Sequence, residues 1–497
     1  MNVRDVLQDV PVRSIAGDTN VEIVAVASDS RLVATGTLFV AIPGLKTDGA
    51  KFIESAVQKG AAAIVTEEAW TGSGGQTVVQ VDDARGTLAL IAANFYGRPA
   101  FKLSLVGVTG TSGKTTTTKM IESVFDAAGE PVGLIGTIEY RAGEERLVAD
   151  RTTPDAIVLQ QWFAKMVAAK VRHAVMEVSS HALSLKRTLG IRFAAGVFTN
   201  LSQDHFDFHK DFEDYFAAKR MLFDQIDRSR KTAVVNVDDP YGRRLAAELG
   251  ATAMTFGSSP EADIHPQEGF RIDVTGLHGT VMTPEGAVRI QSNLLGAPNL
   301  SNWMGAIGAA LTVGIPVETI EEGIRTLQSV RGRFETVPSA DADGPTVLVD
   351  YAHKPDALEK LLHAVRDLSD GRRVVVLFGC GGDRDRDKRA KMGAIAARLA
   401  DSVVLTSDNP RSEKPEAILD DIESGMAGAE NFVRIVDRRD AIARTLLEST
   451  ARDVVVIAGK GHESYQVVGD QILHFDDREE AQFALKTRHE KKSHKAI

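Results

Sequence analysis

The residues with the clearest chemical potential lie in a glycine-rich segment at positions 103–119, Leu-Ser-Leu-Val-Gly-Val-Thr-Gly-Thr-Ser-Gly-Lys-Thr-Thr-Thr-Thr-Lys. Backbone N–H groups in such a turn, at the start of a helix, can surround the phosphates of a nucleotide. Lys114 would add a positive charge and Thr115 a hydroxyl for Mg²⁺. Val108 stands where the strict phosphate-binding loop has glycine, so the motif is a variant, Gly-Thr-x-Gly-Lys-Thr. A purely structural turn would not need the Lys-Thr pair, and the segment therefore predicts ATP binding.

Strand and helix patterns must position this loop. The apolar run ending at Val108 predicts a buried strand, and the buried face of the following helix is predicted at Ile121, Val124, Phe125 and Ala128. Three further apolar strands, at 174–178, 196–199 and 233–236, each lead into polar residues. In a parallel sheet with helices outside, these strand ends converge on the edge that carries the phosphate loop. We therefore expect metal ligands and substrate contacts at this edge.

Two groups of polar residues follow these strands. Glu177 is placed to bind Mg²⁺ beside Thr115, because hard cations prefer carboxylate and hydroxyl oxygens, and a surface carboxylate is the alternative. The second group combines acidic and imidazole side chains, at Asp204, His205, Asp207 and His209. Because no cysteine accompanies them, a single histidine near Mg²⁺ or an ordinary loop is preferred over a transition-metal site. Lys219 lies in a helical pattern, which alone predicts a solvated lysine.

Shorter elements flank this central region. Residues 1–99 contain strand and helix patterns that predict a small α/β domain. The strand patterns lie at 21–27, 38–42 and 62–66 and the helix pattern at 52–59. Loops at 28–31 and 43–49 are either ligand contacts or plain connections. Residues 264–293 resemble a small β excursion, and 299–311 reads as an apolar helix.

Residues 336–497 repeat a strand and a helix several times, which indicates a doubly wound, Rossmann-like sheet without the dinucleotide fingerprint. Charged loops follow three of these strands and contain Arg389, Arg411 and Glu463. A guanidinium group suits a carboxylate, and a carboxylate suits an ammonium group. The loops therefore predict a pocket for an amino acid. The charged residues 488–495 read as a frayed, solvated tail.

Composition limits the remaining possibilities. The chain has 497 residues, and its formal net charge of −10 argues against a general nucleic-acid surface. The single cysteine, Cys380, excludes an internal disulfide framework and agrees with a reducing cytoplasm. Polar residues interrupt the N-terminus, and no stretch reaches the apolar length of a membrane span. We therefore expect a soluble, cytoplasmic α/β protein that is not exported.

Several motifs in order give the chain a family resemblance. They are Gly-Thr-x-Gly-Lys-Thr-Thr, Met-Glu-Val-Ser-Ser-His, Thr-Asn-Leu-x-x-Asp-His-x-Asp-x-His, Ala-Ala-Lys, Asp-Tyr-Ala-His, Asp-Asn-Pro-Arg and Gly-Lys-Gly-His-Glu. This combination resembles the Mur ligases over nearly the whole chain, roughly residues 20–470. The resemblance implies three α/β domains, namely a UDP-binding domain at 1–99, a central P-loop ATPase domain at 100–335 and a Rossmann-like amino-acid-binding domain at 336–497.

The resemblance also implies a reaction in cytoplasmic peptidoglycan precursor synthesis. ATP would phosphorylate the D-glutamate carboxylate of UDP-MurNAc-L-Ala-D-Glu to an acyl phosphate, which an amine would attack to give an amide, ADP and phosphate. Lys114 and the loop amides would stabilise charge on the transferred phosphoryl group. Thr115 and Glu177 would hold one Mg²⁺, and His205 with a carbamate on Lys219 would hold a second. A carbamate turns the lysine into an anionic oxygen ligand. The resemblance therefore assigns Lys219 a role as a metal ligand, in place of the solvated lysine that the helical pattern alone predicts.

Matches to the family motifs imply three sets of binding residues. The ATP set is Gly110, Thr111, Ser112, Gly113, Lys114, Thr115, Thr116, Asn299, Asn302, Arg333, Asp350, Tyr351 and His353. The UDP-muramoyl-dipeptide set is Ser28, Ser30, Thr152, Thr153, Ser179 and Arg187. The amino-acid set is Arg389, Asp408, Asn409, Pro410, Arg411, Gly459 and Glu463.

Asp-Asn-Pro-Arg resembles the signature of family members that use meso-diaminopimelate, whose distal carboxylate Arg411 would hold. A lysine pocket would leave Arg411 facing an ammonium group, so diaminopimelate is preferred over L-lysine. The chain departs from the family pattern at Ser112, Leu185 and Lys354 and in the loop 45–47. The uridine contacts of that loop are therefore the least defined.

Two other functions stay open. A folylpolyglutamate-synthase-like ligase would share the ATPase core, but the N-terminal domain and Asp-Asn-Pro-Arg count against it. A nucleotide-switched binding protein would form no covalent product, and Lys219 and Glu177 favour catalysis over this function. We expect a monomer that acts on ATP, UDP-MurNAc-L-Ala-D-Glu and meso-diaminopimelate, with Mg²⁺ and without nucleic-acid partners or a membrane span.

Overall fold

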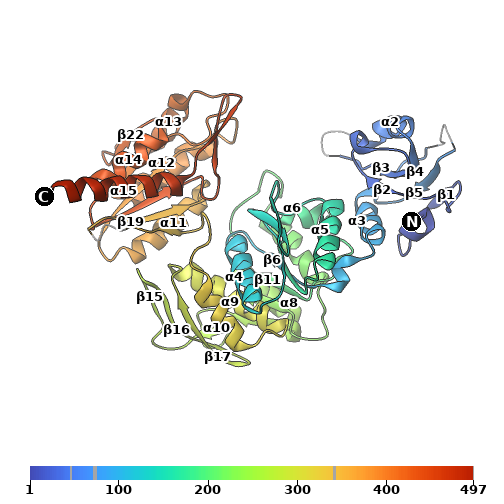
Figure 1. Cartoon of the computed structure of the whole chain (residues 1–497), viewed down its shortest axis with the longest axis horizontal. Helices are drawn as coiled ribbons and strands as arrows, with labels where there is room; N and C mark the ends of the chain where they lie inside the picture. Colours follow the sequence, from blue (N-terminus) through green and yellow to red (C-terminus); the bar gives the residue numbers. More distant parts are fainter. Residues whose placement is uncertain (45–47, 71–74, 340–342, 496–497) are drawn as a thin grey trace. The chain divides into compact units, whose positions relative to one another are not determined.

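The computed structural model describes residues 1–44, 48–70, 75–339 and 343–495, and Figure 1 shows its elements coloured along the sequence. The chain forms two compact units. One contains Met1–Pro266, Val281–Val288 and Ser301–Gly323, and the other contains Gln267–Thr280, Arg289–Leu300 and Ile324–Ile497. The domain limits expected at 99 and 335 stay predictions, and the uridine loop at 45–47 lies outside the described residues.

The N-terminal sheet has five strands in the order β1-β5-β4-β3-β2. The strands are β1 Ser14–Ala16, β2 Ala25–Ala27, β3 Thr37–Val40, β4 Ala61–Thr66 and β5 Thr77–Gln80. Strand β1 is antiparallel to β5, and the other neighbours are parallel. Alternate strand residues pack on helices α1 (Val3–Val6) and α3 (Ala84–Phe95) on one face and on α2 (Ile53–Gln58) on the other. The predicted small α/β arrangement is therefore present.

The central sheet has eight strands in the order β13-β12-β11-β6-β10-β7-β8-β9. They are β6 Ser104–Thr109, β7 Val132–Ile135, β8 Glu139–Ala142, β9 Glu145–Val148, β10 His173–Glu177, β11 Ala195–Phe198, β12 Ala233–Asn236 and β13 Ala253–Phe256. The strands from β13 to β7 run parallel, and β8 and β9 form an antiparallel edge. The carboxyl ends of β6, β10, β11 and β12 therefore meet at one edge, as the strand patterns predicted.

Helices cover both faces of the central sheet. The helices of this region are α4 Lys114–Ala127, α5 Ala156–Ala168, α6 Ser180–Ser184, α7 Phe212–Arg220, α8 Pro240–Leu249, α9 Ala297–Thr312 and α10 Val317–Thr326. Leu105 and Met176 face one apolar core, to which α5, α7 and α8 contribute. On the other face, Gly305 and Gly308 bring α9 against Val197 and Val234. A small antiparallel sheet precedes α9, with β14 His265–Pro266, β15 Arg271–Asp273, β16 Gly276–Thr283 and β17 Gly286–Ser292.

The C-terminal sheet has six strands in the order β18-β19-β23-β20-β21-β22. They are β18 Glu335–Val337, β19 Thr346–Asp350, β20 Arg373–Phe378, β21 Ser402–Leu405, β22 Phe432–Arg434 and β23 Asp453–Ala458. All pairs except β18 with β19 are parallel. Along β20, Val374 and Val376 pack on α11 (Pro355–Leu368), α12 (Asp387–Leu399) and α13 (Pro415–Glu423). Val375 and Leu377 pack on α14 (Arg438–Glu448) and α15 (Asp477–Lys495), which gives a doubly wound sheet without the fingerprint loop.

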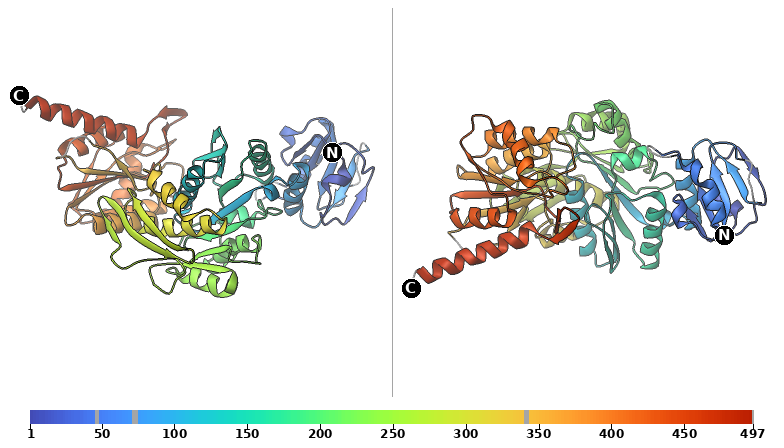
Figure 2. Two further views of the ribbon diagram at one scale, coloured as in Figure 1. Left: turned by 60° about the horizontal axis from the view of Figure 1, so that its bottom comes forward. Right: turned by 90° about the horizontal axis from the view of Figure 1, so that it is seen from above.

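Two further elements near the C-terminus accompany this sheet without adding a strand to it. A hairpin of β24 (Tyr465–Val468) and β25 (Gln471–His474) follows β23, and α15 packs along α14 and continues outward in both views of Figure 2. The expected fraying of the tail at 488–495 is wrong, because helix α15 extends to Lys495, whereas the expected solvent exposure is found at residues 489–491. Buried Arg488 donates hydrogen bonds to the carbonyl oxygens of Leu446 and Leu447, which fix the start of that segment. None of the helices in the described parts of the chain is long and apolar enough to cross a membrane.

Candidate active site

The glycine-rich loop joins β6 to α4 and depends on two glycines. Gly110 has a φ of +149° and Gly113 a φ of +85°, a region that side chains rarely adopt. A Cβ atom at Gly110 would collide with Thr199 Oγ1, and one at Gly113 would lie 2.5 Å from Asn302 Oδ1. Asn200 closes the loop, because its Oδ1 accepts a hydrogen bond from Ser112 N at 3.0 Å. The loop therefore presents backbone groups at the N-terminus of a helix, as the motif predicted.

Two lysines meet at this loop. Lys114 Nζ donates to the carbonyl oxygens of Gly110 and Thr111 at 2.9 and 3.0 Å, and Lys219 Nζ donates to Gly110 at 2.7 Å. Lys219 is 1% exposed, and its Nζ lies 4.3 Å from the centre of the Tyr215 ring. Burial first, and then the charge of Lys114, hold the pKa of Lys219 well below its usual value. The solvated lysine predicted from the helical pattern is therefore wrong, because α7 turns this residue inward.

Glu177 is a buried carboxylate at the end of β10. It is 1% exposed and accepts hydrogen bonds from Thr115 Oγ1 at 3.0 Å and from the amide and hydroxyl of Thr137 at 2.7 and 3.0 Å. The alternative of a surface carboxylate is therefore wrong. A carboxylate next to the hydroxyl of the phosphate-loop threonine is a suitable oxygen pair for Mg²⁺.

The two histidines of the 204–209 segment have different surroundings. His205 has a φ of +56°, contacts Asp204, and its side chain is 37% exposed. Its ring lies 6.3 Å from the Tyr215 ring that Lys219 covers. His209 is buried between Ser180 Oγ and Asp214 Oδ2, at 3.0 and 3.1 Å. Within the described ranges, no three His, Cys, Asp or Glu side chains are grouped as a possible metal site.

Residues predicted to contact the muramoyl peptide surround the end of β10. Thr153 Oγ1 donates to Glu177 O at 2.8 Å and lies 3.3 Å from Ser179 Oγ. Arg187 donates to Thr153 O at 2.7 Å, and burial lowers the pKa of this guanidinium. Thr152 Oγ1 lies 3.0 Å from Thr137 Oγ1. Ser28 directly follows β2 of the N-terminal sheet, and Ser30 begins a short 3-10 helix, Ser30–Leu32, so the predicted contacts form two groups.

The predicted nucleotide residues also form separate groups. Asn302 lies beside the phosphate-loop helix, where its Oδ1 accepts a hydrogen bond from Thr117 at 3.3 Å, whereas Asn299 donates to Leu295 O. At the end of β19, the Asp350 carboxylate accepts hydrogen bonds from the backbone amides of Phe334 and Ala352 at 2.7 and 2.8 Å. Burial raises the pKa of this carboxyl group. The Arg333 guanidinium lies 4.7 Å from the Tyr351 ring, which also contacts His353.

The predicted amino-acid residues cluster at the carboxyl edge of the C-terminal sheet. Arg411 has a φ of +52°, and its Nη1 donates to Gly382 O at 2.8 Å. Asn409 Nδ2 donates to Glu463 Oε2 at 2.9 Å, and Lys460 Nζ lies 3.2 Å from Asn409 Oδ1. Pro410 adjoins this group, and Gly459 has a φ of +115° at the turn after β23. One cluster thus contains a guanidinium, carboxylates and an amide.

Arg389 lies beneath this cluster. Its guanidinium is fully buried, bonds both carboxylate oxygens of Glu413 at 2.8 and 2.9 Å and bonds Asp421 at 2.8 Å. Glu413 Oε1 also accepts a hydrogen bond from the backbone amide of Asp383. The Arg389–Glu413 ion pair therefore connects the two loops that carry Gly382 and Arg411. Direct binding of the amino acid by Arg389 stays a prediction.

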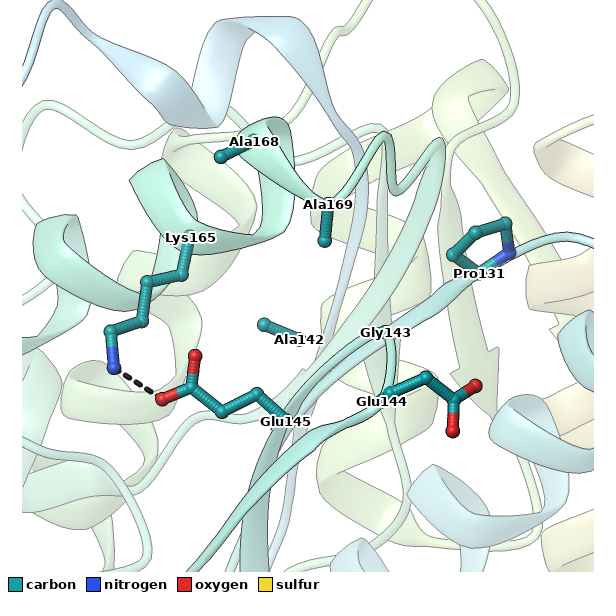
Figure 3. Close-up of a pocket in the computed structure, with 8 residues that line it drawn as sticks. All are labelled: Pro131, Ala142, Gly143, Glu144, Glu145, Lys165, Ala168 and Ala169. Carbon is teal, nitrogen blue, oxygen red and sulfur yellow. Dashed lines mark hydrogen bonds and ion pairs between the residues drawn. The ribbon is translucent and has the colours of Figure 1, made fainter.

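A hollow of about 450 Å³ lies in the central region, away from the phosphate loop (Figure 3). Pro131, Ala142 and Ala169 contribute to its lining, and an ion pair of Lys165 with Glu145 lies beside it at 2.5 Å. Pro131 comes immediately before β7, so the hollow is at the amino end of this strand. The phosphate loop follows the carboxyl end of β6 at the opposite edge of the sheet.

Sequence reasoning assigned no role to four residues of these groups, which are Thr137, Asn200, Tyr215 and Lys460, although it identified the strand ends that carry Asn200 and Lys460. Thr137 comes shortly after β7, and Glu177 ends β10, so the rule of polar residues at strand ends could have found Thr137. Asn200 follows β11 in the same way. Lys460 follows β23 in the same way, but its burial has no local signal, and neither has that of Tyr215, because contacts with residues distant in sequence bury both.

Comparisons with known proteins agree with this arrangement. The family model of the Mur ligase middle domain matches residues 108–310, that of the Mur ligase glutamate ligase domain matches 332–461, and that of the Mur ligase family catalytic domain matches 22–96. A UDP-N-acetylmuramoyl-L-alanyl-D-glutamate--2,6-diaminopimelate ligase of Gloeobacter violaceus is 48% identical over 94% of this chain and 95% of its own length. The ligase of the same name from Thermosynechococcus vestitus is 46% identical over 94% of each chain.

Solved structures are similar as well. A ligase of the same name has a TM-score of 0.71 and 31% identity, over 98% of this chain and all of its own. A folylpolyglutamate synthase of Mycobacterium tuberculosis has a TM-score of 0.59 and 20% identity over 74% of this chain and 91% of its own, a likeness of fold alone. The full-length matches, together with the phosphate loop and the two charged sheet edges, show that this chain belongs to the Mur ligase family.

Proposed function

We propose that this protein uses ATP to join meso-2,6-diaminopimelate to UDP-N-acetylmuramoyl-L-alanyl-D-glutamate in the cytoplasm. The observation that carries the proposal is the cluster on the C-terminal sheet, where Arg411 Nη1 lies 3.5 Å from the carbonyl oxygen of Asn409 and the Asn409 side chain donates a hydrogen bond to Glu463. A cluster that contains both a guanidinium and a carboxylate suits the carboxylate and ammonium groups of an amino-acid centre. Relatives that are 40–48% identical over nearly their full length carry the name of this reaction.

The reaction has two chemical steps. A carboxylate oxygen of the D-glutamate attacks the γ-phosphorus of ATP, which forms an acyl phosphate and releases ADP. The neutral amino group of diaminopimelate then attacks the acyl carbon, forms the amide bond, loses a proton and expels inorganic phosphate. Charge accumulates first on the transferred phosphoryl group and then on the tetrahedral carbon's oxygen, so fixed donors are the main requirement.

The residues of the central sheet suit the first step. Lys114 and the loop amides would bind the phosphates, and Asn302 beside the loop would contact the nucleotide. Thr115 and Glu177, whose oxygens are 3.0 Å apart, would hold one Mg²⁺, and His205 with a carbamate on Lys219 would hold a second. When bound, Mg²⁺ neutralises charge on the phosphate oxygens.

Lys219 would join this set as a carbamate. Its pKa is well below the usual value because burial and Lys114 disfavour the charged form, and the neutral amine is the form that reacts with carbon dioxide. The product would be an anionic oxygen ligand beside Lys114 at the phosphate loop. A carbonyl resonance from Lys219 in protein equilibrated with ¹³C-bicarbonate would support this modification. A spectrum equal to that of Lys219→Ala would contradict it.

The remaining predicted contacts follow the same division. Thr152, Thr153, Ser179 and Arg187 would bind the muramoyl peptide, with Ser28 and Ser30 at the uridine nucleotide. Arg333, Asp350, Tyr351 and His353 would contact ATP, as would Asn299. Arg389 would act on the amino acid directly or through Glu413, which it holds by two hydrogen bonds.

Phosphate release tests the proposed function. Purified protein with Mg-ATP and UDP-MurNAc-L-Ala-D-Glu should turn over with meso-diaminopimelate and give a tripeptide product by mass. If L-lysine were the only amino acid to support turnover, the protein would still be a ligase, but Arg411 would not bind a distal carboxylate of the substrate. Turnover with a folyl substrate and glutamate alone would favour the folylpolyglutamate-type ligase, and slow ATP hydrolysis without any ligation product would favour a nucleotide-switched protein.

A further inference from the structure

A buried lysine behind the amino-acid cluster has no assigned role. Lys460 follows β23, in the turn between Gly459 and Gly461, and its side chain is 0% exposed. Its Nζ lies 3.2 Å from Asn409 Oδ1 and 3.5 Å from a carboxylate oxygen of both Asp408 and Glu463. A lysine is rarely buried to this degree unless it is paired.

We propose that Lys460 is a positioning residue that balances the charge of the amino-acid site, so that the site matches a zwitterionic amino-acid centre. This inference rests on the proposed function, in which the distal end of diaminopimelate carries one ammonium and one carboxylate group. The role of Lys460 is to act through Glu463 and Asn409 without contacting the substrate.

The charges around Lys460 support this role. Asp408 and Glu463 are both acidic and both lie 3.5 Å from Nζ, so the three side chains together carry one net negative charge. Without Lys460 the same space would hold two unbalanced carboxylates. One net negative charge matches one ammonium group, and Arg411 supplies the positive group for a carboxylate.

Lys460 also fixes the orientation of Asn409. Asn409 Oδ1 is approached by two donors, Lys460 Nζ at 3.2 Å and the backbone amide of Val467 at 2.9 Å. An amide oxygen accepts and its nitrogen donates, so Asn409 Nδ2 must point to Glu463 Oε2, at 2.9 Å. The hairpin containing Val467 is itself bonded to the Arg411 backbone, at 3.0 Å, which holds the cluster together.

Several groups determine the ionisation of Glu463. Burial and the charge of Asp408 raise its pKa, whereas Lys460 and Asn409 lower it. Further groups face it from neighbouring elements: Tyr351 after β19, Tyr465 on β24, and Arg438 on α14, which is paired with Asp477. Removal of Lys460 would therefore raise the pKa of Glu463 further and favour the neutral form of the carboxyl group that takes the ammonium group.

The test is a double-mutant cycle on the full-length protein at two pH values. Lys460→Met should raise the KM for diaminopimelate about tenfold at pH 7, because a rise of about one unit in the pKa of Glu463 can change its ionised fraction by up to about tenfold. The KM for ATP should be unchanged. Raising the pH to 9 favours the ionised form of Glu463 in both proteins, so the ratio of the variant KM to the wild-type KM should fall below about threefold. In an Asp408→Asn background, one of the two carboxylates that Lys460 balances is already absent. Lys460→Met should therefore change the KM for diaminopimelate by less than about threefold at pH 7 in this background.

Two results would overturn the proposal. One is a KM ratio that is equal at pH 7 and pH 9, and the other is an equal effect of Lys460→Met with and without Asp408; either would show that Lys460 only packs. If Lys460→Met does not fold, Lys460→Gln keeps a donor toward Asn409 while removing the charge and completes the same cycle. Absence of ligation in the wild-type protein would instead contradict the proposed function.

Discussion

The central and C-terminal sheets both carry their functional loops at the carboxyl ends of parallel strands, but they build these loops from different groups. At the central sheet, the loop between β6 and α4 is formed by glycines and backbone amides, with Lys114 and Lys219 sharing the carbonyl of Gly110. At the C-terminal sheet, the loops are held by pairs of charged side chains, such as Arg389 with Glu413.

The difference corresponds to the charge of what each edge would bind. A triphosphate is highly anionic, so backbone donors, a helix N-terminus and lysines stabilise it, and the nearby carboxylate of Glu177 is left for Mg²⁺. An amino-acid centre carries both charges, so its site needs a cation and an anion that do not neutralise each other. The positive group is Arg411, and Lys460 leaves the acidic side with a single net charge.

The largest expected effect is at Lys219. Lys219→Ala should reduce ligation by on the order of 10³-fold or more, because it removes a proposed metal ligand and the donor to Gly110 O. Ligation rate and thermal unfolding are the measurements, and the melting temperature should remain near that of the wild type. Added short carboxylic acids should restore part of the activity by occupying the space of the carbamate.

The control for this variant is Lys231→Ala, which removes an exposed lysine paired with Asp263 at 2.9 Å. This change should leave kcat within about twofold, since exposed ion pairs contribute little. Full activity of Lys219→Ala would contradict both the carbamate on Lys219 and the assignment of the phosphate chemistry to the central sheet.

A smaller loss is expected when the charge of Glu177 is removed. Glu177→Gln keeps a similar shape and can still accept the Thr137 amide, but it lacks the negative charge proposed for Mg²⁺. We expect kcat to fall by about 10²-fold and the Mg²⁺ concentration for half-maximal activity to rise. An unchanged Mg²⁺ dependence, measured by titration at saturating ATP, would show that Glu177 has only a structural role.

At the other sheet, Arg411→Ala should affect one substrate. Loss of a charge-assisted hydrogen bond, about 1.5–3 kcal/mol, should raise the KM for diaminopimelate by tenfold or more and leave the KM for ATP within about twofold. Initial rates with each substrate varied in turn provide both values. If both KM values rose together, the two edges would not have separate substrates.

The smallest expected effect concerns acid stability. Arg389 holds the pKa of Glu413 at about 2, below its usual range, so Glu413 stabilises the folded state above its unfolded pKa and loses this contribution as pH falls toward 2. Glu413→Gln should therefore lower stability by roughly 1 kcal/mol near neutral pH and by progressively less below about pH 4. Denaturant unfolding at several pH values measures this difference, and a gap between the two proteins that widens in acid would contradict the pairing.

Much of the central edge could be predicted because its signals are local. An apolar strand, glycines and Lys114 follow one another directly, and Glu177 ends a strand whose place in a parallel sheet is set by topology. The burial of Lys219 could not be predicted from its helix, since its partner Gly110 is 109 residues away. Only the family resemblance corrected the prediction that Lys219 is a solvated lysine.

The C-terminal site was predictable in composition but not in its internal pairing. Strand ends identified the loops with Arg411 and Glu463, whereas the pairing of Arg389 with Glu413 and the burial of Lys460 depend on how separate loops pack. The same reason explains the error at residues 488–495. Their charged composition suggested a solvated tail, but Arg488 reaches the carbonyl oxygens at the end of α14.

The central claim is that acyl phosphate formation belongs to the central sheet and amino-acid binding to the C-terminal sheet. Its most direct test is hydroxamate formation from Mg-ATP, UDP-MurNAc-L-Ala-D-Glu and hydroxylamine without diaminopimelate, since hydroxylamine traps an acyl phosphate. Arg411→Ala should form hydroxamate at a rate near that of the wild type, whereas Lys219→Ala should form almost none. Loss of hydroxamate in Arg411→Ala, or its full retention in Lys219→Ala, would contradict this division.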